Sequence, residues 1–139
     1  MSANKDLARK AIEMWAADSH VDRSIFSPSY RNHQEPLAKG GVAFIDLDTW
    51  ADVVEAVHRA FPDLKVEIIS QTAEDERVST HWRFHGTYLG PYLDRSATGR
   101  KVSWMGIQID RISDGLIEES VVVWDFHSLL VQLGWVEDF

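Results

Sequence analysis

One aspartate stands where a carboxylate could do acid–base chemistry. Asp125 directly follows the apolar run from Val121 to Trp124. A carboxylate among apolar neighbours is costly to ionise, so the position predicts a raised pKa and a general base that works near neutral pH. In the alternative interpretation Asp125 only caps the helix that the sequence predicts from Phe126. The residues alone favour neither interpretation.

The histidines raise the question of a metal site. His81 and His85 are the obvious pair, but four residues along a strand span roughly 13 Å, which is too far to hold one ion. With Arg83 they share one face of a predicted strand, which either lines a cavity or faces solvent or a second copy. His33 lies in a polar segment, 30–34, that is predicted to be irregular, and there it is either functional or a solvated loop residue. We expect no metal.

Aromatic side chains are the other candidate for a site, because they line small-molecule pockets as readily as cores. The residues concerned are Trp15, Trp50, Trp82, Trp104 and Trp124. Each also falls on an apolar stripe, so both interpretations remain open. Motifs for phosphate-binding glycine loops, serine nucleophile elbows and nicotinamide or flavin binding are absent from the sequence.

The elements that must position these residues follow from hydrophobic periodicity. Apolar residues at helical spacing predict helices first, and β-branched and aromatic runs predict strands after them. The predicted helices cover 3–17, a short turn within 20–28, 46–60 and 126–134, and the strands cover 65–72, 78–88, 102–112 and 116–124. Helices followed by a long sheet predict an α+β domain in which an antiparallel sheet, strongly bent around packed helices, encloses a cavity.

The last two strands have a predictable register. Asp114-Gly115 is a preferred pair for a two-residue hairpin turn with both residues at positive φ. Counting back from that turn predicts that Gln108 faces Val121 and that Trp104 faces Asp125. The residues then expected on one face are Trp104, Gly106, Gln108, Val121, Val123 and Asp125.

Composition limits the function classes. The 139 residues predict a single domain over 1–139, and a net charge of −8 argues against nucleic acid and membrane as partners. The absence of cysteine excludes disulfides and thiolate sites and fits a reducing compartment. With no signal peptide or membrane-length apolar run, the expected location is the cytoplasm.

Several short motifs stand in a recognisable order in the second half of the chain. They are Phe61-Pro62-Asp63-Leu64, Gly86-Thr87-Tyr88-Leu89-Gly90, Thr98-Gly99-Arg100-Lys101-Val102, Arg111-Ile112-Ser113-Asp114-Gly115-Leu116-Ile117-x-Glu119, Trp124-Asp125 and Gln132-Leu133-Gly134. Together they resemble the SnoaL-like polyketide cyclases, with matching order and spacing from about residue 50 to residue 134. The resemblance implies the nuclear transport factor 2-like cone fold, which agrees with the helix-then-sheet interpretation.

The resemblance also implies chemistry. Members of the family close a ring of a polyketide by intramolecular aldol condensation without metal or organic cofactor. Asp125 matches the family's acid/base aspartate, and His33 and Gln108 are the expected oxyanion donors. The other expected substrate-binding residues are Trp104, Tyr88, His85, Arg83, Trp15 and Trp50. A hydrophobic small-molecule substrate and a homodimer formed through the outer sheet face are the expected partners.

Departures from the family pattern leave other functions open. At the position of Tyr88 the family usually has histidine, and at the position of Val121 it usually has tryptophan. One alternative is the related branch proposed to hydroxylate anthracycline-type polyketides. Epoxide hydrolysis on the same cone needs an Arg-x-Asp pair, and the sequence has none. The remaining alternative is a non-catalytic protein that binds a hydrophobic ligand.

Overall fold

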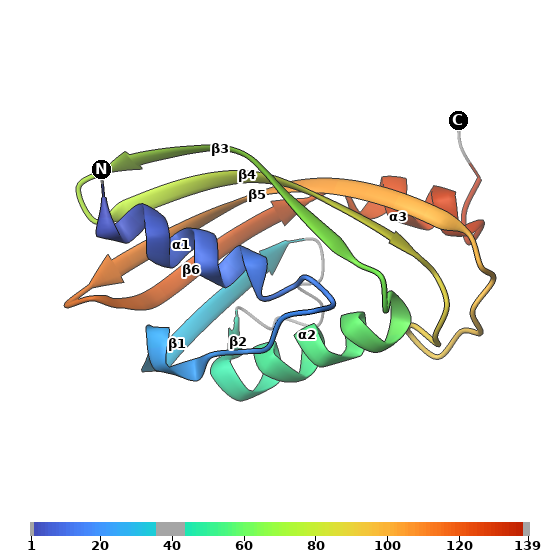
Figure 1. Ribbon diagram of the computed structural model, residues 1–139, viewed down its shortest axis with the longest axis horizontal. Coiled ribbons are helices and arrows are strands. Elements are labelled where there is room, and N and C mark those ends of the chain that lie inside the picture. Colours follow the sequence, from blue (N-terminus) through green and yellow to red (C-terminus); the bar gives the residue numbers. More distant parts are fainter. Residues whose placement is uncertain (1, 36–43, 138–139) are drawn as a thin grey trace.

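The computed structural model describes residues 2–35 and 44–137, which form three α-helices, a short 3₁₀ helix and one six-stranded sheet. Two helices precede the four strands of residues 65–124, and the third helix follows them (Figure 1). The elements are α1 (Ala3–Glu13), η1 (Arg23–Ile25), β1 (Phe26–Glu35), β2 (Ile45–Asp46), α2 (Leu47–Ala60), β3 (Lys65–Glu74), β4 (Arg77–Thr87), β5 (Lys101–Ser113), β6 (Leu116–Trp124) and α3 (Phe126–Leu133).

Side-chain caps fix where the helices begin. Ser2 accepts a hydrogen bond from the Lys5 backbone N–H at 2.9 Å, and Asp46 does the same for Thr49 at 2.9 Å. These caps satisfy donors that the first helical turn leaves unpaired. Gly134 ends α3 with φ of 78°, a left-handed conformation that glycine adopts without strain. The predicted positions of α2 and α3 are confirmed, and α1 ends four residues earlier than predicted.

The sheet has the strand order β2-β1-β6-β5-β4-β3. Its neighbours are antiparallel except β1 and β6, which are parallel, so the predicted antiparallel sheet is in fact mixed. Figure 1 shows the sheet curling over α1 and α2. The predicted α+β cone is therefore confirmed.

The strand β1 is the main element that the sequence did not predict. The short helix predicted within 20–28 is only the 3₁₀ turn η1, and the polar segment 30–34 is not irregular but part of a ten-residue strand. Its polar residues alternate between a buried face and an exposed one, because β1 pairs with β6 inside the sheet. Strand propensity alone misses such a segment, since tertiary pairing decides it.

The β5–β6 hairpin has the predicted turn but not the predicted register. Asp114 and Gly115 have φ of 52° and 75°, and Ile112 pairs with Ile117 as predicted. A β-bulge follows, since Arg111 pairs with Glu119 and leaves Glu118 as an extra residue on β6. Because side chains alternate along a strand, this one-residue shift moves the rest of β6 to the opposite face from the one predicted.

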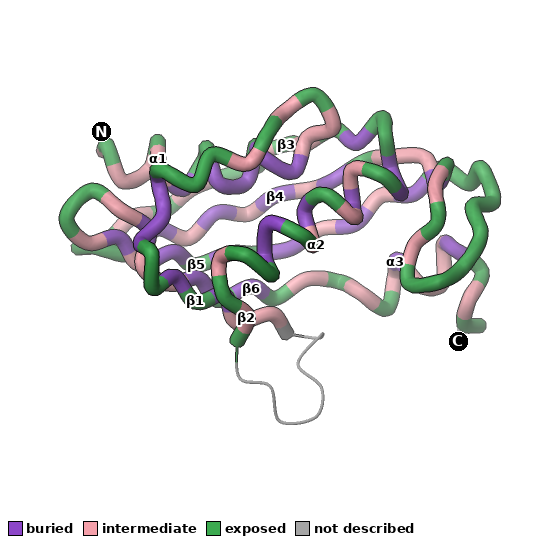
Figure 2. Tube along the Cα trace, turned by 90° about the horizontal axis from the view of Figure 1, so that it is seen from below, coloured by how far each residue is buried: buried purple, intermediate pink, exposed green. Residues whose placement is uncertain are grey.

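The inner face of the sheet therefore carries a different set of β6 residues. Trp104, Gly106 and Gln108 share it with Val122 and Trp124, and the prediction that Val121, Val123 and Asp125 lie there is wrong. Val121 and Val123 are exposed on the outer face. Figure 2 shows this alternation of buried and exposed residues along the strands.

Candidate functional site

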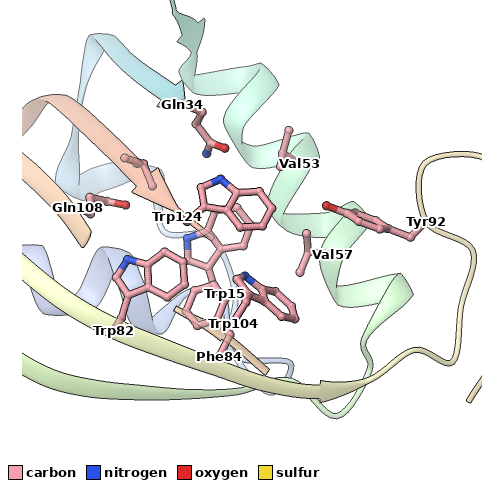
Figure 3. Close-up of a pocket in the computed structure, with 11 residues that line it drawn as sticks. Trp15, Gln34, Val53, Val57, Trp82, Phe84, Tyr92, Trp104, Gln108 and Trp124 are labelled. Atoms are coloured by element: carbon pink, nitrogen blue, oxygen red, sulfur yellow. The ribbon is translucent and has the colours of Figure 1, made fainter. Parts of the chain in front are cut away.

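A cavity lies between the inner face of the sheet and the two helices α1 and α2 (Figure 3). The space that the centres of water-sized molecules can occupy in it is about 40 Å³, within a wider space of about 480 Å³ that includes open solvent. The residues that line it come from the turn after α1, from β1, α2 and β4, from the loop after β4, and from β5 and β6. They are Trp15, Gln34, Val53, Val57, Trp82, Phe84, Tyr92, Trp104, Gln108, Val122 and Trp124.

Aromatic rings form most of the wall. Trp82 stacks on Phe84 with ring centroids 4.1 Å apart, and Trp104 meets Phe84 edge to face at 5.7 Å. The predicted pocket residues Trp15 and Trp104 line the cavity, but Trp50 does not. Trp50 is 1 % exposed and packs edge to face on Trp15 at 5.9 Å, so it supports the wall from behind.

Three polar side chains reach this aromatic cavity. Gln34 and Gln108 contribute amides, and Tyr92 contributes a phenol from the loop after β4. Burial raises the pKa of Tyr92 to about 12, so the phenol keeps its proton and can donate. The site therefore offers neutral hydrogen-bonding groups on an apolar wall, an arrangement suited to a flat, oxygen-bearing organic ligand.

Behind Gln108 lies a buried polar network that sequence analysis missed. Gln108 Nε2 donates to Asp110 Oδ1 at 2.9 Å, and Ser120 Oγ donates to the same oxygen. The Tyr30 hydroxyl donates to Ser120 Oγ at 2.7 Å. Asp110 is fully buried, and this burial raises the pKa of its carboxyl to about 6. The signal was available, because Asp110 continues the inward alternation of Trp104, Gly106 and Gln108.

Asp125 has the structural role that the sequence left open. Its carboxylate accepts a hydrogen bond from the Ser128 backbone N–H at 2.9 Å and so caps α3. The expectation that Asp125 is surrounded by apolar side chains is wrong: the residue is exposed and does not line the cavity. The bulge at Glu118 explains the error, because it turns Trp124, and not Asp125, toward the inner face.

His33 lies on the opposite side of the sheet from the cavity. In β1 it stands between Asn32 and Gln34, which face inward, so its ring is on the outer face. There its Nε2 lies 2.7 Å from Glu119 Oε2. This hydrogen bond, with the charges of nearby arginines, lowers the pKa of Glu119. His33 therefore cannot hold an oxyanion in this cavity, and its predicted role as a donor there is wrong.

The β4 side chains that the sequence places either at a cavity or on an outer face lie on the outer face of the sheet. His85 and Arg83 lie on the outer face, where His85 contacts Glu67 at 3.1 Å and both contact the Ser103 hydroxyl, so neither lines the cavity. Tyr88 is fully buried and its hydroxyl donates to the Arg95 carbonyl at 2.6 Å, which anchors the loop that carries Tyr92. The predicted substrate contacts of these three residues are therefore wrong.

Gly106 provides the space that the Trp82 ring occupies. A Cβ at position 106 would lie 2.4 Å from Trp82 Cζ2 and 2.7 Å from Trp124 Cβ. We expect Gly106→Ala to lower the free energy of unfolding by about 1–3 kcal/mol, because the ring must leave its position. Urea unfolding measures this. Gly86→Ala is the control with a smaller expected loss, since its closest contact, at 3.0 Å, is the end of the Leu64 side chain. Equal losses would contradict the prediction.

Two kinds of feature are absent from the described residues. No helix in the ranges 2–35 and 44–137 is long and apolar enough to cross a membrane. In the same ranges no three histidine or acidic side chains gather as metal ligands would.

Comparison with known proteins identifies relatives of this fold. The profile of the SnoaL-like polyketide cyclase family matches residues 5–133. No curated protein sequence matches the chain. Among solved structures, AclR of Streptomyces galilaeus, named as a candidate hydroxylase, superposes with a TM-score of 0.83 at 26 % identity, over 98 % of this chain and 83 % of AclR.

Two further structures carry cyclase names. A candidate SnoaL-like polyketide cyclase of Jannaschia sp. CCS1 has a TM-score of 0.80 at 17 % identity, over 94 % of this chain and 91 % of its own. IdmH of Streptomyces antibioticus, a candidate polyketide cyclase, has a TM-score of 0.77 at 21 % identity, over 94 % of this chain and 98 % of IdmH. The fold is thus the nuclear transport factor 2-like one that the sequence predicted.

Proposed function

The chain belongs to the SnoaL-like polyketide cyclase family, and from that premise we propose that it closes a ring of a polyketide-type substrate by intramolecular aldol condensation without a cofactor. The observation that carries the proposal is the cavity, whose wall is aromatic and whose polar groups are amides and a phenol. Flat ring systems with ketone and hydroxyl groups match that lining.

We assign the acid–base step to Asp125. Its carboxylate removes a proton from a carbon between two carbonyl groups, the resulting enolate attacks a ketone of the same molecule, and the new alkoxide takes the proton back. The assignment rests on the match of Asp125 to the family's acid/base aspartate. In this structure Asp125 lies at the end of β6, directly after Trp124 and outside the cavity lining, and the Ser128 N–H holds one carboxylate oxygen. The substrate must therefore extend past Trp124 to reach the other oxygen.

The first experiment is a thermal-shift screen with polycyclic aromatic polyketides and their methyl esters. A ligand that binds only the folded state raises the melting temperature with its affinity and concentration. Compounds that stabilise the protein are then incubated with it, and products are separated from substrate by liquid chromatography and identified by mass spectrometry. An aldol closure without loss of water gives a product of unchanged mass. No stabilisation by any compound of the panel would contradict a polyketide pocket.

Hydroxylation is the second candidate, and the superposition on AclR favours it. It would add one oxygen atom to the substrate and would need molecular oxygen with a reductant, so the product mass separates the two reactions. Binding without any turnover would instead support a non-catalytic ligand carrier.

The outer sheet face supports a homodimer. Ile107 pairs with Val123 and Ile109 with Val121, and all four side chains are 39–58 % exposed on neighbouring strands. An apolar patch of this kind on a sheet face favours contact with a second copy.

We therefore expect Val123→Lys to weaken dimerisation about a hundredfold, because two unpaired charges would be buried in each dimer. Light scattering after size-exclusion chromatography measures the mass. Val136→Lys is the matched control, since Val136 is 39 % exposed but lies in the C-terminal segment outside this sheet patch. A dimer that survives Val123→Lys, or a monomeric wild type, would contradict the proposed interface.

A further inference from the structure

We propose that the Trp82 indole N–H and the Gln108 amide oxygen form a donor–acceptor pair that binds a carbonyl and a neighbouring hydroxyl of the substrate. This inference rests on the proposed function and deepens it, because it names the chemical feature that the cavity recognises. It also assigns a hydrogen-bond donor, the Trp82 indole N–H, to the substrate carbonyl oxygen that becomes negative during the reaction.

The first observation is a buried donor without an acceptor. Trp82 is 4 % exposed, and its Nε1 is buried with no hydrogen-bond partner among the described residues. Buried polar atoms are nearly always paired, so an unpaired one needs an explanation. Four other buried atoms of the described residues are also unpaired, on Asn32, Trp50, His81 and Asp110. Among these five residues, Trp82 is the one that lines the cavity.

The second observation is the direction of the Trp82 ring. Its position against Gly106 puts Cζ2, the ring carbon on the same edge as Nε1, directly over the β5 backbone. Stacking on Phe84, with an interplanar angle of 23°, holds the plane of the ring. Figure 3 shows the Trp82 nitrogen on the side of the ring that faces Gln108. The register agrees, because Trp82 pairs with Gly106 and Gln108 is the next residue on the same face.

The third observation is that Gln108 has a fixed orientation. Its Nε2 donates to Asp110 Oδ1 at 2.9 Å, so the amide oxygen is the end left for the cavity. In Figure 3 this oxygen points into the cavity. Asp110 is itself held by Ser120 and fully buried. Asp110 is therefore a positioning residue, which acts on the substrate only through Gln108.

A donor beside an acceptor recognises a complementary pair. A carbonyl oxygen accepts from the indole N–H, and an adjacent hydroxyl donates to the amide oxygen. The enol form of a 1,3-dicarbonyl unit carries both groups, as does an aromatic hydroxyl next to a quinone carbonyl. When a proton leaves the carbon between two carbonyls, the carbonyl oxygen gains negative charge, and the hydrogen bond from Trp82 strengthens.

The test uses two probes that differ only in the hydroxyl. These are 1,8-dihydroxyanthraquinone and its dimethyl ether, titrated by tryptophan fluorescence. The wild type is expected to bind the dihydroxy compound about three- to tenfold more tightly, and Gln108→Met is expected to abolish that preference. Trp82→Phe is expected to weaken binding of both probes by about three- to tenfold, because one neutral hydrogen bond is lost while the ring remains.

Trp50→Phe is the matched control. It removes an indole N–H that is also buried and unpaired, but Trp50 does not line the cavity. Equal losses in Trp82→Phe and Trp50→Phe, or a wild type that binds both probes equally, would overturn the inference and leave the aromatic pocket standing. If neither probe binds the wild type, the proposed function fails, and this inference fails with it.

A second measurement covers the case in which Trp82→Phe does not fold. The wild-type protein labelled with ¹⁵N shows its indole N–H signals separately by nuclear magnetic resonance. Addition of the dihydroxy probe is expected to move one indole proton downfield, since it gains an acceptor. Indole signals that stay in place while the probe binds would overturn the assignment of Trp82.

Discussion

Asp125→Asn is expected to lower turnover by about two to four orders of magnitude, the usual contribution of a general acid–base group, while the protein stays folded. The amide has the shape of the carboxylate but cannot take a proton from carbon. Asparagine is as good a helix cap as aspartate, so its side-chain oxygen still accepts from the Ser128 N–H. The substitution therefore removes the proposed chemistry and keeps the structural role. Initial rates and the melting temperature measure the two separately.

Two further variants complete the test. Asp125→Ala is expected to lose the same activity and, in addition, about 1 kcal/mol of stability with the cap. Asp46→Asn is the matched control, because Asp46 likewise caps a helix, α2, through the Thr49 N–H at 2.9 Å but does not match the family's acid/base aspartate. It is expected to leave the rate unchanged. A rate for Asp125→Asn within about threefold of the wild type would contradict acid–base catalysis by Asp125 and leave it only as a cap.

The sequence was a good guide wherever local chemistry decides the structure. The Asp114-Gly115 turn is confirmed because its two positive φ angles suit that pair of residues. The helix α2 is confirmed because Asp46 and an apolar stripe mark it. The overall fold followed from the order of these elements and from the family motifs.

The site was harder to predict because it depends on two non-local features. The bulge that leaves Glu118 unpaired carries no glycine or other local signal, yet it decides which β6 residues face the cavity. Likewise, β1 is a strand because of its pairing with β6, and that pairing turns His33 outward and Gln34 inward. Trp15, Trp104 and Gln108 line the cavity as expected because their elements contain neither feature. The Gln108 Nε2, however, donates to Asp110, so the predicted role of Gln108 as an oxyanion donor does not fit this arrangement.

The carboxyl of Asp110 is expected to make stability depend on pH in the opposite sense from the exposed carboxylates. Burial raises its pKa in the folded protein to about 6 from an ordinary value of 3.8. Between these values the folded state binds more protons than the unfolded state, so this contribution to stability is full below pH 3.8 and is lost as the pH rises to 6. The loss is about 3 kcal/mol, which is the free energy that corresponds to a pKa difference of about two units.

Comparison with Asp110→Asn isolates this group from the others. Glu119, Asp46 and Asp63 have lowered pKa values, so their contributions are lost as the pH falls and would mask the effect in the wild type alone. The asparagine oxygen can still accept from Ser120 and Gln108, and it cannot titrate.

We therefore expect Asp110→Asn to gain about 3 kcal/mol relative to the wild type between pH 4 and pH 7, as measured by urea unfolding at each pH. A stability difference that does not change with pH would mean that the Asp110 pKa is the same in the folded and unfolded states. The buried carboxyl would then carry its charge at pH 5, and the hydrogen bonds from Gln108 and Ser120 would offset its burial.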